Sequence, residues 1–120
     1  MKGTSWGYWR KTVALDRDIR PALDSAVARY QKHSEKHITK SRIVNDLIRK
    51  SNLKNLDSYS SLHQKGKRDR LTLDIDFDNF KKINDQTALL IEQAAKSGIK
   101  VPSPNFSRTL NSILRKELGL

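Results

Sequence analysis

One pattern constrains the fold of this chain more than any other: a ten-residue segment with helical periodicity occurs twice. SRIVNDLIRK at 41–50 returns as SRTLNSILRK at 107–116, with five identities and three exchanges of one apolar residue for another. A strand-like segment precedes each copy, because RKTVALD at 10–16 returns as RLTLDID at 70–76. Two segments that recur in the same order, at offsets of 60 and 66 residues, indicate one structural unit present twice.

Each unit is too small to be an independent domain. A chain of about fifty residues rarely buries enough apolar surface to fold by itself, so we expect both units to share one core. The sequence predicts an N-terminal arm at 1–9, a first unit at 10–51, a polar linker at 52–69 and a second unit at 70–120. The arm is rich in Trp and Tyr, which suits either a mobile arm that orders on nucleic acid or a flap over the core.

Each unit is predicted to contain a strand followed by two helices. In the first unit, apolar residues alternate with others over 10–16, and helical spacing follows at 19–33 and at about 40–51. Asp18 and Thr39 stand at the positions of N-caps for these two helices.

The second unit repeats this order with a longer turn. Its strand is predicted at 70–77, with Phe77 on the apolar face, and Asp78 is expected to cap a helix that ends near Gly98. The apolar stripe of that helix is predicted to contain Phe80, Ile83, Leu90, Ile91 and Ala94, and a final helix is predicted at about 105–118.

The charge favours a polyanionic partner. The chain has 24 Lys and Arg against 13 Asp and Glu, a formal net charge of +11, and such an excess most simply suits nucleic acid. There is no cysteine, and neither a secretory leader nor a membrane span is expected, so the predicted location is the cytoplasm. We find no catalytic motif and expect neither an enzyme nor a cofactor or metal; His33 and His37 are interpreted as surface histidines.

A strand, a helix, a turn and a helix that opens with a small polar cap resemble the ribbon-helix-helix family of DNA-binding proteins, to which Arc, MetJ and CopG belong. Two units in one chain are similar to the tandem single-chain form typified by the plasmid protein TraY. The resemblance covers residues 10–118. It implies a mostly α fold with a short two-stranded antiparallel ribbon, in which two tandem ribbon-helix-helix units form one intramolecular pseudo-dimer. The monomer is expected to bind double-stranded DNA, and two unequal units in one chain permit an asymmetric site.

One face of that ribbon is predicted to read bases. A two-stranded ribbon fits the major groove of B-DNA, which is about 12 Å wide, and arginine there suits guanine while aspartate accepts from the cytosine amino group. The side chains expected on this face are Arg10, Thr12, Ala14, Arg70, Thr72 and Asp74.

The resemblance further implies that the N-terminus of the second helix in each unit holds a DNA phosphate. Those positions are Thr39, Lys40 and Ser41 in the first unit, and Asn105, Phe106 and Ser107 in the second. The second set departs from the pattern, because an aromatic residue replaces the lysine. The rest of the repeated helix, with its Asn and its terminal Arg-Lys pair, is interpreted as a solvated face.

Several roles stay open at this stage. A DNA-binding chain of this kind suits a relaxosome accessory protein in plasmid transfer, with a relaxase or further copies of itself as partners, or a transcriptional repressor. An antitoxin is disfavoured because we expect no toxin-wrapping tail after the last helix. The alternative from another class is a protein-interaction adaptor of a mobile element with non-specific affinity for nucleic acid.

Overall fold

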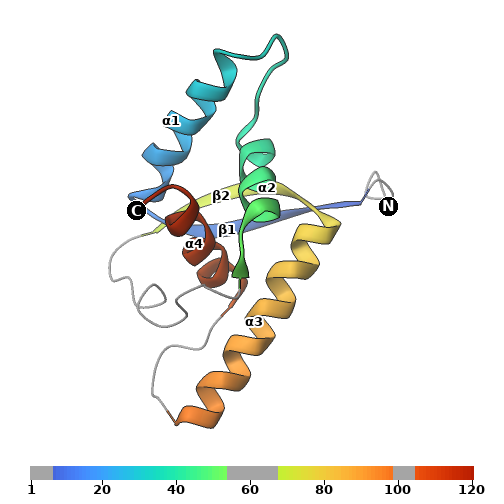
Figure 1. Ribbon diagram of the computed structural model, residues 1–120, viewed down its shortest axis with the longest axis vertical. Helices are drawn as coiled ribbons and strands as arrows, with labels where there is room; N and C mark the ends of the chain where they lie inside the picture. The colour runs from blue at the N-terminus through green and yellow to red at the C-terminus, as the bar shows by residue number, and fades with distance from the viewer. Residues whose placement is uncertain (1–6, 54–67, 99–104) are drawn as a thin grey trace.

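The computed structural model describes residues 7–53, 68–98 and 105–120, which form two strands and four helices (Figure 1). Most of the expected linker and arm lies outside these residues. The expectation of a mostly helical chain with a two-stranded antiparallel sheet is confirmed. The elements, in chain order, are β1 (Tyr8–Asp16), α1 (Ile19–Gln31), α2 (Lys40–Lys50), β2 (Arg68–Asp76), α3 (Phe77–Ser97) and α4 (Phe106–Glu117).

The two strands form one antiparallel ribbon. Tyr8 pairs with Asp76 at one end and Asp16 with Arg68 at the other. β1 begins two residues before the expected start at 10, so Tyr8 and Trp9 belong to the ribbon and not to an arm. β2 ends at Asp76, and the placement of Phe77 on the apolar strand face is wrong: this residue begins α3 and is 48% exposed.

The core lies on one face of the ribbon. Val13, Leu15, Leu73 and Ile75 are buried, while the alternate residues between them point the other way, as the period of a strand requires. All four helices contact the ribbon. Their buried apolar side chains include Ile19, Leu23, Ile43, Val44, Ile48, Ile83, Leu110, Ile113 and Leu114.

The second helix of each half packs on the strand of the other half. α2 contacts β2 and α4 contacts β1, and Figure 1 shows α2 and α4 side by side across the ribbon. One buried cluster among the described residues therefore contains side chains from both halves of the chain. Neither half can complete this core without the other, since each strand is covered by the second helix of the opposite half of the chain.

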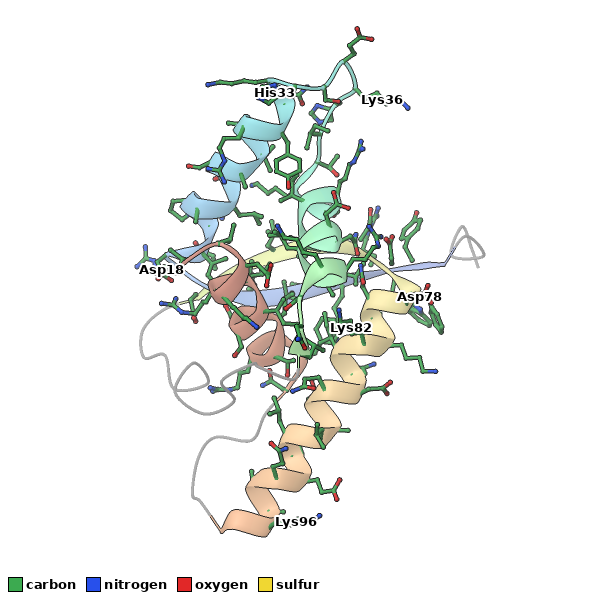
Figure 2. The ribbon with its side chains drawn as sticks, in the orientation of Figure 1. Asp18, His33, Lys36, Asp78, Lys82 and Lys96 are labelled. Atoms are coloured by element: carbon green, nitrogen blue, oxygen red, sulfur yellow. The ribbon has the colours of Figure 1, made fainter. Side chains whose placement is uncertain are left out.

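The two aspartates expected to cap first helices do not cap them. Asp18 is at the N-cap of α1 but makes no cap hydrogen bond; its carboxylate instead accepts hydrogen bonds at 2.8 Å from Nη1 of Arg115 on α4 (Asp18 is labelled in Figure 2). Asp78 lies inside the first turn of α3, whose N-cap is Asp76. A carboxylate near a helix N-terminus is favoured by the helix dipole even without a cap hydrogen bond. The sequence therefore predicts an aspartate at the start of each helix, but it does not predict whether its carboxylate caps the helix.

α3 is the longest helix and extends away from the ribbon (Figure 1). It ends as predicted at Gly98, which adopts the left-handed conformation with φ of 67°. Leu90 is buried, but its neighbour Ile91 is 47% exposed. The prediction that Ile91 belongs to the apolar stripe is therefore wrong. Adjacent residues on a helix point about 100° apart and do not share one face.

A lysine of α3 closes the end of α2. Nζ of Lys82 donates to the carbonyl oxygens of Ile48 at 2.8 Å and Ser51 at 2.9 Å (Figure 2). The last carbonyls of a helix have no partner within the helix, and a cation there also complements the helix dipole. Within the described ranges, no helix is long and apolar enough to cross a membrane.

Candidate nucleic-acid interface

The face of the ribbon opposite the core gathers all six residues predicted to read bases. Thr12 lies opposite Thr72 at the centre, with the two hydroxyl oxygens 2.9 Å apart. On either side of this pair, Arg10 lies opposite Asp74 and Arg70 lies opposite Ala14. The arginines and threonines are exposed, and the other two residues are partly exposed.

The cross-strand pairs of this face are of the close, non-hydrogen-bonded kind. The backbone N–H groups of Ala14 and Asp74 donate to helix side chains and not to the neighbouring strand. In an antiparallel pair such residues have Cα atoms about 4.5 Å apart, against about 5.5 Å for hydrogen-bonded pairs. Side chains on the outward face therefore meet across the strands.

One such meeting is an ion pair. Nε of Arg10 donates to Oδ1 of Asp74 at 2.9 Å, with the two side chains 70% and 39% exposed. The hydrogen bond, followed by the charge of the carboxylate, raises the pKa of Arg10 above its ordinary value. The guanidinium is thus charged at any working pH. The equivalent Arg70 faces the methyl group of Ala14 and has no carboxylate opposite it.

The outer edges of the ribbon are held by two matching sets of side chains, which we call the edge clamps. The clamp on β2 comes from α2: the Ser41 hydroxyl accepts from the backbone N–H of Asp74 at 2.9 Å, and the Asn45 amide accepts from the N–H of Asp76 and donates to the carbonyl of Asp74. Serine and asparagine four residues apart share one face of a helix, so both reach the same strand edge.

The clamp on β1 comes from α4 and repeats these contacts. The Ser107 hydroxyl accepts from the N–H of Ala14 at 3.1 Å. The Asn111 amide accepts from the N–H of Asp16 at 2.7 Å and donates to the carbonyl of Ala14 at 2.8 Å. A two-stranded ribbon has two edges of unpaired backbone groups, and the clamps satisfy them where the helices bury them.

The edge clamps correct the interpretation of the repeated helix as a solvated face. Asn45 is 7% exposed and Asn111 is 2% exposed. Both arginines of the terminal Arg-Lys pairs are also engaged: Arg49 pairs with Asp76 at 2.7 Å, and Arg115 pairs with Asp18. The signal that sequence reasoning missed was the identical Ser-to-Asn spacing in both copies, because a solvated face has no reason to keep an asparagine.

The N-terminus of α2 has the expected cap, and its first turn contains cationic side chains. Thr39 is extended, and its hydroxyl accepts from the backbone N–H of Arg42 at 3.2 Å. Lys40 is partly exposed and pairs with Asp24 of α1 at 3.1 Å. Ser41 belongs to the edge clamp, so its hydroxyl is already bound to the ribbon.

The N-terminus of α4 opens into a cavity next to the ribbon. Asn105 caps the helix by accepting from the N–H of Arg108 at 2.9 Å. The side chain of Phe106 is buried and packs on Phe80 with ring centroids 4.9 Å apart, so it offers no side-chain contact to a phosphate. The cavity has a volume of about 360 Å³ and is lined by Lys11, Thr12, Ala14, Asn105, Phe106, Ser107 and Arg108.

Lys11 supplies a cation that sequence reasoning did not assign to this site. Its Nζ lies 4.9 Å from the ring centroid of Phe106 and 5.8 Å from that of Phe80. The attraction between an ammonium group and aromatic rings restricts the position of the lysine side chain. Trp9 packs on Phe77 and Phe80 nearby, with centroid distances of 6.3 and 5.7 Å, so this part of the predicted arm covers α3.

Comparisons with known proteins add no relative: no family model, no curated protein and no solved structure matches the chain. Among the described residues there is also no group of three side chains suited to bind a metal ion. His33 and His37 are both exposed. The candidate site is therefore defined by its own geometry, as a ribbon whose outward face carries two arginines and which lies between two helix N-termini.

Proposed function

We propose that this protein binds double-stranded DNA sequence-specifically through the outward face of its ribbon, as two tandem ribbon-helix-helix units that form one intramolecular pseudo-dimer. One observation carries the proposal: Thr12 pairs with Thr72, the residue 60 positions later, so the ribbon is centred on equivalent residues. The edge clamps agree, because Ser41 and Asn45 do on one edge what Ser107 and Asn111 do on the other. Such a twofold pattern is what two copies of one unit produce.

The chemistry of the outward face suits the major groove. A two-stranded ribbon fits this groove, and arginine reads guanine through O6 and N7 while threonine contacts several bases or the thymine methyl group. Arg10 and Arg70 lie on opposite sides of the central threonine pair. The ribbon therefore offers a guanine reader to each half of a DNA site.

Two helix N-termini beside the ribbon suit the DNA backbone. The free N–H groups in the first turn of a helix, together with its dipole, attract phosphate. Lys40 lies at the N-terminus of α2, and Lys11 lies beside the cavity at the N-terminus of α4. We assign phosphate contacts to the first-turn backbone of both helices and to these lysines, and not to the side chain of Phe106.

The biological role proposed is that of a relaxosome accessory protein in plasmid transfer or of a transcriptional repressor in the cytoplasm. Both roles need a protein that occupies a defined DNA site. Carrying both units in one chain replaces dimerisation by an internal event at an effective concentration of about millimolar, so binding does not depend on a monomer–dimer equilibrium. A single chain also permits an asymmetric site.

The proposal is tested by selecting binding sites from random duplex DNA and then measuring affinity at two salt concentrations. We expect one enriched motif, and we expect Arg70→Ala to lower affinity for it by roughly 10- to 100-fold while relaxing one base position. Lys81→Ala removes an exposed charge on α3 and serves as the matched control. Selection without any enriched motif, or equal losses for both variants, contradicts sequence-specific reading.

An adaptor with non-specific nucleic-acid affinity is the second candidate, favoured by one observation. Leu89 and Ile91 on α3 are 46% and 47% exposed, and exposed apolar side chains on a protruding helix suit a protein partner. This candidate predicts that every duplex binds alike, with affinity that falls steeply with salt because only phosphates are neutralised.

A further inference from the structure

We infer that the two ends of the ribbon read DNA with unequal stringency, and that Asp74 is the residue that makes them unequal. The Arg10–Asp74 end is a strict two-residue reader, and the Arg70–Ala14 end is a permissive one. The inference rests on the proposed function. It gives the DNA site a direction, with a guanine next to an amino-bearing base in the strict half.

The comparison is clean because the residues occupy equivalent positions. Arg70 stands 60 residues after Arg10, and Asp74 stands 60 residues after Ala14. The antiparallel pairing places Arg10 opposite Asp74 and Arg70 opposite Ala14. At this level of the ribbon, the two ends thus differ by one carboxylate in place of one methyl group.

The ion pair leaves the reading edge of Arg10 available. Asp74 is bound through Nε, at 2.9 Å, and within the described part of the chain neither Nη group of Arg10 is engaged. A guanine is contacted by two N–H groups of one guanidinium, on O6 and N7. A carboxylate on Nε therefore orients the planar group without competing for the N–H groups that face the base.

Orientation before binding matters for a long side chain. Fixing an arginine from several rotamers into one costs entropy on binding, and a group held in advance in the bound geometry avoids that cost. Arg10 is 70% exposed yet held at Nε by Asp74, whereas Arg70 is exposed opposite Ala14. Arg10 thus tolerates a wrong base less well, because its fork does not swing to another acceptor.

Asp74 also adds a contact of its own. Oδ1 is bound to Arg10, and Oδ2 has no partner among the residues described. A carboxylate oxygen in the major groove accepts from the amino group of cytosine or adenine and repels bases that present an oxygen there. The strict end therefore reads two neighbouring base pairs, whereas the methyl group of Ala14 adds no polar contact at the other end.

The test is a binding-site selection with the full chain and five variants. Arg10→Ala and Arg70→Ala first assign one motif position to each arginine. We expect the guanine preference of the wild type to be at least about tenfold stronger at the Arg10 position than at the Arg70 position. Asp74→Ala then relaxes the Arg10 position to the level of the other, and Ala14→Asp sharpens the Arg70 position.

Asp85→Ala is the matched control for Asp74→Ala, since it removes one exposed carboxylate from α3 and leaves the ribbon unchanged. Each variant removes one negative charge, and the affinity for random duplex rises more in Asp74→Ala because Asp74 lies on the DNA-facing surface. The control keeps the wild-type motif. Circular dichroism verifies that Ala14→Asp, which places a carboxylate at a partly buried site, is folded. If this variant does not fold, Asp74→Ala alone shows whether Asp74 controls the stringency at the Arg10 position.

The outcomes separate the inference from the proposed function. If Asp74→Ala strengthens the guanine preference at the Arg10 position, the carboxylate restrains Arg10 and the inference is wrong. Equal stringency at both positions in the wild type overturns it as well, while in both cases the enriched motif still supports sequence-specific binding. A wild type that enriches no motif removes the proposed function, and the inference with it.

Discussion

Asn111 of α4 supports the ribbon edge through a single side chain, and Asn111→Ala isolates that contribution. The asparagine is 2% exposed. Its amide accepts from the N–H of Asp16 at 2.7 Å and donates to the carbonyls of Ala14 and Ser107, both at 2.8 Å. Alanine keeps the helix but leaves these three backbone groups without the partner that the edge clamp supplies.

The expected loss follows from the cost of unpaired groups. A buried backbone donor or acceptor without a partner costs about 1–3 kcal/mol. The Ser107 carbonyl lies within α4 and has its helical partner, so the two groups of β1 dominate. We expect a loss of about 3 kcal/mol, a large share of the roughly 6–18 kcal/mol total typical of a chain this long.

Urea denaturation followed by circular dichroism measures this loss. Asn84→Ala is the matched control, because Asn84 is exposed on α3 and alanine is the better helix former by about 0.5 kcal/mol. Amide hydrogen exchange adds a local readout: the N–H of Asp16 loses protection in Asn111→Ala and keeps it in the control. If Asn111→Ala stays within about 1 kcal/mol of the control, or the Asp16 amide remains protected, the edge clamp does not stabilise the ribbon as argued.

Three further predictions concern stability. Arg115→Ala breaks the pairs with Asp18 and with the buried Asp16, at a side chain 18% exposed, and lowers the free energy of unfolding by at least about 1 kcal/mol. Arg49→Ala, at 60% exposure, lowers it by less than about 0.5 kcal/mol. Equal effects in urea denaturation contradict this. Thr39→Ala removes the α2 cap and costs about 1 kcal/mol, and an unchanged denaturation midpoint argues against the cap. Gly98→Ala lowers the melting temperature, because a φ of 67° costs a residue with a Cβ about 1 kcal/mol of backbone strain. The added Cβ meets nothing within 4 Å, so no steric clash contributes. A higher melting temperature contradicts this argument.

The sequence by itself determined the elements and most of their buried apolar faces, because these follow from local periodicity; Phe77 and Ile91 are exceptions. Alternation with period two separates buried Val13 from exposed Thr12, and the same rule separates Leu73 from Thr72. The cap at Thr39 and the end of α3 at Gly98 are also local, since a cap or a left-handed residue involves neighbours within one turn. The repeat was visible for the same reason.

Only the tertiary structure decided what those faces meet. The pairing of Arg10 with Asp74 joins residues far apart in the chain, and it depends on a strand register fixed by helices that pack from the opposite half. The role of Asn111 was hidden for the same reason, because its partners Ala14 and Asp16 approach it only after the ribbon has formed. Side-chain chemistry shows what a residue is able to bond, but long-range packing selects the group that it bonds.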